Sequence, residues 1–66
     1  MGLGNHLKEI RMKEYMMSQM EFAKLIGVNY RQYNRWENGT APSGETMLNI
    51  AKKLNKKVED IFYIVE

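Results

Sequence analysis

The segment Tyr30–Glu37 concentrates the side chains best suited to recognising another molecule. At about 100° per residue, Tyr33 and Trp36 fall on one side of a helix. The outward residues are then Tyr30, Arg31, Asn34 and Arg35, with Gln32 between the two faces. Arginine can donate two parallel hydrogen bonds to guanine, and asparagine or glutamine can pair similarly with adenine. The pattern therefore indicates either a helix that reads base edges or a polar, solvated helix face.

The composition allows one small domain and points to no other chemistry. Sixty-six residues, 44% of them hydrophobic, suit a single core near the lower size limit for folding without cross-links. The chain has no cysteine and no apolar run of roughly 18 residues, which excludes disulfides, thiolate metal sites and a membrane span. No cluster of acid, base, nucleophile or metal ligands occurs, so neither an enzyme nor a cofactor is expected.

Charge is distributed unevenly along the chain, whose net charge is +2. Residues 1–36 carry six Lys and Arg against three Glu, a balance of +3, whereas residues 37–66 carry −1. A basic first half suggests a polyanionic partner.

Five short helices are predicted, and the expected fold class is all-α. The first is expected over residues 5–15, with Asn5 as N-cap and Met1–Gly4 as a frayed terminus. The fourth is expected from Gly44 after the cap Ser43. Its predicted inner stripe is Met47, Leu48, Ala51 and Leu54.

The remaining short elements follow from similar signals. The fifth helix is expected over Val58–Phe62, and residues 63–66 form a β-prone, apolar tail that suits a dimer contact. Methionine side chains are flexible enough to fill gaps in a core. Those expected to do so are Met17, Met20 and Met47.

The second and third helices have the clearest boundaries. Ser18 and Glu21 have the spacing of a capping box, and Gly27 suits the left-handed residue that ends a helix. Asn29 is a good cap for the next helix, which ends at Asn38-Gly39. Two helices of about eight residues joined by such a short turn predict helix-turn-helix geometry.

The motifs Ser18-Gln19…Glu21-Phe22-Ala23…Gly27 and Trp36-Glu37-Asn38-Gly39 are the most specific in the chain. Other stretches in the same order are Leu7–Arg11, Pro42–Ser43, Glu45–Thr46, Ile50–Ala51, Leu54 and Val58–Phe62. Together they resemble the Cro and phage-repressor (XRE-like) type of helix-turn-helix domain. The resemblance implies a lambda-repressor-like fold of five helices, with residues 5–62 as a single DNA-binding domain.

The resemblance also implies a role for individual residues. Tyr30, Arg31 and Arg35 correspond to residues that reach base edges. Gln32 and Asn34 are lesser candidates, one of which contacts phosphate instead. Gln19 and the group Asn38, Gly39 and Thr40 correspond to two phosphate clamps on either side of the recognition helix. Arg11 and Glu37 correspond to a structural ion pair that ties the first helix to the third.

One departure from the family pattern concerns the end of the first helix. The stretch between Arg11 and Gln19 is one residue longer than usual, and Met16 stands near the expected glycine. Either a longer first helix or a wider turn is predicted there.

Two functions follow from the resemblance. The first is a cytoplasmic, sequence-specific regulator of transcription, a repressor that binds an inverted repeat in double-stranded DNA as a homodimer. Its recognition helix is expected over residues 29–37. The alternative is a protein-interaction module, such as an antitoxin or an adaptor, in which DNA binding is secondary. Arg31 and Arg35 favour DNA, whereas the apolar tail favours a protein partner.

Overall fold

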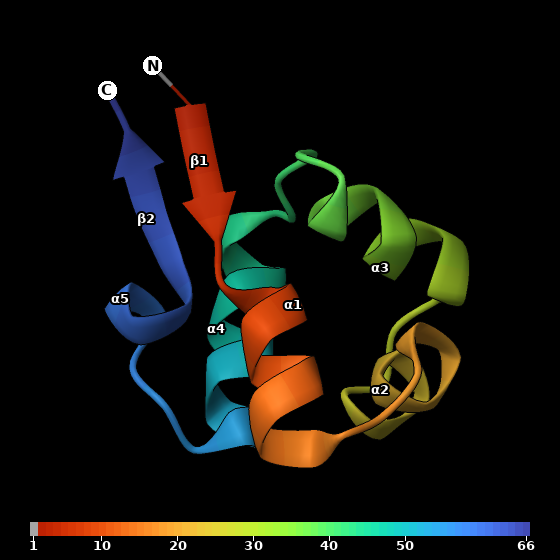
Figure 1. Ribbon diagram of the computed structural model, residues 1–66. Coiled ribbons are helices and arrows are strands. Elements are labelled where there is room, and N and C mark those ends of the chain that lie inside the picture. Colours follow the sequence, from red (N-terminus) through yellow and green to blue (C-terminus); the bar gives the residue numbers. More distant parts are fainter. Residues whose placement is uncertain (1) are drawn as a thin grey trace.

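One apolar core joins all the helices of the protein. The computed structural model describes residues 2–66, and Met1 lies outside the described residues. The elements in chain order are β1 (Gly2–Asn5), α1 (Leu7–Ile10), η1 (Arg11–Tyr15), α2 (Gln19–Leu25), α3 (Tyr30–Glu37), α4 (Gly44–Leu54), α5 (Val58–Ile61) and β2 (Phe62–Val65). The largest fully buried side chains, Tyr33, Phe22, Leu7, Ile50 and Ile61, come from five different helices. The core therefore fixes the helices relative to one another. Figure 1 shows the resulting arrangement of the helices.

The α2–turn–α3 unit forms as its capping signals predict. The Ser18 hydroxyl accepts a hydrogen bond from the Glu21 amide at 3.2 Å, and the Glu21 carboxylate accepts one from the Ser18 amide at 3.0 Å. Gly27 adopts φ +75°, which requires little strain only in glycine. The Asn29 side chain then accepts from the Arg31 amide at 2.8 Å and starts α3. The helix-turn-helix prediction is confirmed.

The additional residue before α2 is accommodated inside the first helix. α1 continues into η1, a π-helical turn over Arg11–Tyr15 that takes up one more residue than an α-helical turn. Met16, which stands near the glycine expected from the family pattern, then takes the left-handed conformation, with φ 51°. The first helix starts at Leu7 rather than at Asn5, although the Asn5 side chain still accepts from the Leu7 amide at 3.1 Å.

A two-stranded antiparallel sheet corrects the all-α expectation. β1 pairs with β2, with Leu3 opposite Ile64 and Gly4 opposite Tyr63, and the strands extend past the helices so that both chain ends lie together (Figure 1). Residues 2–4 are therefore not frayed. Two glycines in four residues gave no strand signal, but the Tyr63 ring packs over Gly4 where a Cβ would stand. Pairing with β2 overrides the low local propensity.

Two helix faces also differ from the prediction. Leu48 is 63% exposed, and Ile50 takes its place in the core at 1%. The inner stripe of α4 is Met47, Ile50, Ala51 and Leu54, which follows helical spacing more closely than a stripe with Leu48. Met20 is 64% exposed on α2 and fills no core gap. α5 ends at Ile61, and Phe62 is already the first residue of β2. Within residues 2–66, no helix has the length and apolarity needed to cross a membrane.

Candidate nucleic-acid interface

The outward side of α3 presents side chains that are free to bind. Tyr30, Arg31 and Arg35 are exposed, and within residues 2–66 their side chains take part in no hydrogen bond or ion pair. Gln32 is also exposed but is one of the residues that line a cleft between α3 and α4, as is Lys53. Three of the five residues predicted to read bases thus share an open surface, with Gln32 at its edge.

The inward side of α3 anchors the helix. Tyr33 is fully buried and Trp36 is 6% exposed. The Tyr33 ring contacts Phe22 edge-on at a centroid distance of 5.6 Å and Trp36 at 6.4 Å. Burying two aromatic rings fixes the direction in which the opposite face points. Trp36 is consequently a packing residue, as predicted, and is not available to stack on a base.

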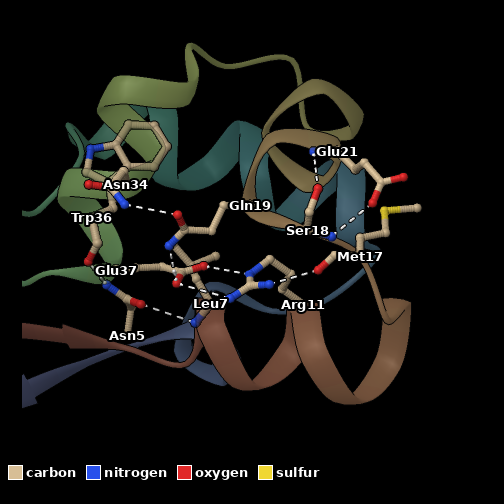
Figure 2. Close-up of polar contacts among 10 residues, drawn as sticks. All are labelled: Asn5, Leu7, Arg11, Met17, Ser18, Gln19, Glu21, Asn34, Trp36 and Glu37. Carbon is tan, nitrogen blue, oxygen red and sulfur yellow. Dashed lines mark hydrogen bonds and ion pairs between the residues drawn. The ribbon is translucent and has the colours of Figure 1, made fainter.

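A largely buried ion pair ties α3 to the end of α1. Arg11 Nε donates to Glu37 Oε2 at 2.9 Å, and the two side chains are only 12% and 4% exposed. Arg11 Nη1 also donates to the Met17 carbonyl at 2.8 Å, across the turn that follows η1 (Figure 2). The π-helical turn therefore absorbs the additional residue without displacing Arg11.

The ion pair sets the protonation state of both partners. The hydrogen bond to Glu37 raises the pKa of Arg11 despite burial. Burial opposes ionisation of Glu37, but hydrogen bonds from Arg11 and Gln19 and the adjacent Tyr33 hydroxyl outweigh it, and the pKa of this carboxyl is lowered. Burial, followed by the contact with the Glu37 carboxylate and by its negative charge, raises the pKa of Tyr33. Glu37 is therefore a fixed negative charge beneath the interface.

Three side-chain amides extend from Glu37 toward the surface. Gln19 Nε2 donates to Glu37 Oε1 at 2.9 Å, and Asn34 Nδ2 donates to Gln19 Oε1 at 3.0 Å (Figure 2). Asn38 Nδ2 donates in turn to Asn34 Oδ1 at 3.1 Å. We call Glu37, Gln19, Asn34 and Asn38 the amide chain. It connects the start of α2 with the end of α3, where the two phosphate clamps are expected.

The backbone amides after α3 are not placed for the phosphate contact that was expected from Asn38, Gly39 and Thr40. The amides of Asn38, Gly39 and Thr40 all donate to carbonyls of α3, at 2.9–3.2 Å. These bonds close the end of the helix, so none of the three amides points a free N–H at a phosphate. The Asn38 side chain and the Thr40 hydroxyl are the polar groups left at this end.

Sequence reasoning missed the structural role of Asn34. It interpreted this residue as a lesser base reader, but both ends of its amide are hydrogen-bonded within the protein. The spacing of Asn34 and Asn38, four residues apart on one helix, is a signal that could have suggested their contact. Nothing local in the sequence indicates that Gln19 approaches Asn34 from another helix.

Among residues 2–66, no group of three His, Asp or Glu side chains is placed to hold a metal ion.

Comparison with known proteins identifies the family. The chain belongs to the helix-turn-helix family of the Cro and phage-repressor type, whose profile matches residues 7–61. It is also similar to antitoxin PezA of Streptococcus pneumoniae serotype 4, with 32% identity over 60 residues. That match covers 89% of this chain but 37% of PezA, so the chain spans little more than a third of that relative.

Proposed function

We propose that this protein is a regulator that binds a specific sequence in double-stranded DNA, with α3 in the major groove. The observation that carries the proposal is the contrast across α3: Tyr33 and Trp36 are buried, while Arg31 and Arg35 are exposed and unpaired within residues 2–66. A rigidly anchored helix that presents unpaired guanidinium groups is suited to reading guanine. Membership of the helix-turn-helix family supports the same function.

Phosphate contacts are proposed on both sides of α3. Gln19 and Asn38 each use one N–H of the side-chain amide within the protein, which leaves the second N–H for a phosphate oxygen. The Thr40 hydroxyl adds a third donor. Such contacts fix the register of the protein on DNA without reading its sequence. The Gly39 amide is already hydrogen-bonded and is not proposed as a phosphate donor. Gly39 instead allows the backbone to turn after α3, because its φ of +116° is strained for residues with a side chain.

The proposed assembly is a homodimer that represses transcription from an inverted repeat. The apolar tip of the sheet supports a contact between copies, because the facing pair Leu3 and Ile64 is 40% and 68% exposed and Val65 is 47% exposed. β2 also has an edge that pairs with no strand among residues 2–66, and an unpaired edge is a ready template for a second strand. Two recognition helices would then enter grooves roughly 34 Å apart.

Selection of bound sites from a random duplex pool at near-physiological salt tests the proposal. Enrichment of an inverted repeat is expected, and its half-site spacing reports the dimer geometry. Weak, salt-sensitive binding without enrichment contradicts sequence-specific recognition. For the dimer, sedimentation at tens of micromolar is decisive: a monomeric mass both alone and on the selected site contradicts it. A reporter placed downstream of that site tests repression.

A second candidate function is that of an antitoxin or adaptor that acts by binding another protein. The specific observation in its favour is the similarity to a protein named as an antitoxin. The two functions are compatible, and the selection experiment discriminates between them: a protein-binding module gives no enriched site. Arg31→Ala then leaves partner binding unchanged, whereas it weakens binding by a DNA reader.

A further inference from the structure

The amide chain has a single direction. Asn38 donates to Asn34, Asn34 donates to Gln19, and Gln19 donates to Glu37. A carboxylate can only accept hydrogen bonds, and Arg11 holds this one in its charged form. Gln19 must therefore turn its NH₂ group toward Glu37 and its oxygen toward Asn34. That oxygen in turn requires the NH₂ group of Asn34, which leaves the Asn34 oxygen for Asn38.

The buried charge thus determines how three amides are oriented, although only one of them contacts it. Side-chain amides have two alternative flips that differ only in where the donor and acceptor lie. Without Asn34, Gln19 would keep its bond to Glu37 but its oxygen would lose its partner, and the whole Asn38 amide would be free to rotate. Asn34 is the only member of the amide chain that contacts both expected phosphate-binding side chains.

We propose that Asn34 is a positioning residue that orients Gln19 and Asn38 for phosphate and does not read a base. This inference rests on the proposed DNA-binding function and refines it at one residue. The remaining N–H groups of Gln19 and Asn38 are the donors that contact phosphate, and Asn34 fixes them relative to one another across α2 and α3. Each end of the Asn34 amide already carries one hydrogen bond within the protein. These two bonds fix the amide plane and leave one N–H and one oxygen lone pair, whereas a base reader must be able to turn its donor–acceptor pair toward the base.

A test on DNA compares Asn34→Ala with Gln32→Ala as a matched control. Gln32 carries the same amide on the same helix but, within residues 2–66, takes part in no side-chain hydrogen bond. Each variant is titrated against the selected site and against that site with single base changes. Asn34→Ala is expected to weaken binding about 3- to 10-fold on every duplex, with the order of preference unchanged. A changed preference at one base pair overturns the proposal, because it marks Asn34 as a reader.

The same substitutions are then made in a protein that already carries Gln19→Ala and Asn38→Ala, at lower salt so that binding stays measurable. Because Asn34 acts through those two side chains, Asn34→Ala is expected to cost less than about twofold there. Gln32→Ala is expected to have the same effect as in the unmodified protein. If Asn34→Ala weakens DNA binding in this background as much as it does in the unmodified protein, the proposal is overturned.

A second measurement needs no DNA and so separates this inference from the proposed function. In the free protein, Asn34→Ala is expected to shift the side-chain amide NMR signals of both Gln19 and Asn38, and Gln32→Ala to shift neither. If either signal stays in place on Asn34→Ala, the coupling is absent. If the signals shift but the unmodified protein binds no duplex, the DNA-binding function fails while the hydrogen-bonded coupling stands.

Discussion

The two parts of the proposed interface differ in how far they are organised before DNA arrives. Arg31 and Arg35 on the outer face of α3 are exposed and held by no side-chain partner among residues 2–66. Gln19 and Asn38 at the flanks are held by hydrogen bonds of 2.9–3.1 Å that lead back to a buried charge. Immobilising a long, free side chain costs roughly 0.5–1.5 kcal/mol on binding, and this cost is largely met in advance at the flanks. If the proposed contacts form, the groups that set the register on DNA are therefore already held in the free protein, whereas the proposed base-reading side chains become ordered only on the DNA.

Removing the charge beneath the flanks is expected to have the largest effect. Glu37→Ala leaves Arg11 buried without its partner and frees Gln19, and we expect a loss of about 3–5 kcal/mol in the free energy of unfolding. For a domain of this size the loss approaches the total stability. Urea denaturation followed by circular dichroism measures it.

The matched control is Glu14→Ala. Glu14 also forms an ion pair, with Lys56 at 3.0 Å, but its side chain is 47% exposed. Solvent screening limits such a pair, so a loss below about 1 kcal/mol is expected. Equal losses for Glu14→Ala and Glu37→Ala would contradict the distinction between a buried and an exposed pair.

On the outer face the expected effect is on binding and not on stability. Arg31→Ala or Arg35→Ala should cost about 1–3 kcal/mol at the selected site and relax base preference there. Their stability should change by less than about 0.5 kcal/mol, because both side chains are exposed. Competition titrations with single-base variants of the site measure the preference. If Arg31→Ala leaves specific binding unchanged, the assignment of the reading face is wrong.

The charge of Glu37 also predicts how stability depends on pH. The pKa of Glu37 is lower in the folded protein than its ordinary value of 4.5, so the folded state releases this proton more readily than the unfolded chain. The resulting stabilisation is fully present above pH 4.5 and is lost as the pH falls toward the lowered value. The melting temperature should therefore drop in that range, and the Glu37 part of the drop should be absent in Glu37→Gln. An unchanged pH profile in that variant contradicts this origin.

The parts of the fold that could be predicted from the sequence were those determined by local signals. The Ser18 and Asn29 caps, the Gly27 turn and the buried face of α3 all follow from neighbouring residues. The strand at residues 2–5 could not be predicted from neighbouring residues, because its stability comes from pairing with residues 62–65 at the other end of the chain. Leu48 was misplaced although helical spacing favours Ile50, so this error did not come from a missing local signal.

In the candidate site, too, features of a single helix could be predicted and contacts between helices could not. The exposed face of α3 is a property of one helix and could be predicted from its periodicity. The amide chain joins Gln19 to Asn34, which are 15 residues apart on different helices, and only the packing of α2 against α3 creates that contact. The resemblance to known helix-turn-helix domains supplied Gln19 and Asn38 as phosphate contacts, but the structure was needed to connect them.

The smallest expected effect concerns Tyr33, whose hydroxyl is buried beside Arg11 and Glu37. Among residues 2–66, this hydroxyl makes no hydrogen bond of good geometry. Tyr33→Phe removes a polar atom that gains little from burial and keeps the ring contacts with Phe22 and Trp36. We therefore expect stability to change by less than about 1 kcal/mol, in either direction. A loss above about 2 kcal/mol in urea denaturation would contradict this expectation, because it would mean that the Tyr33 hydroxyl contributes to stability like a well-formed buried hydrogen bond.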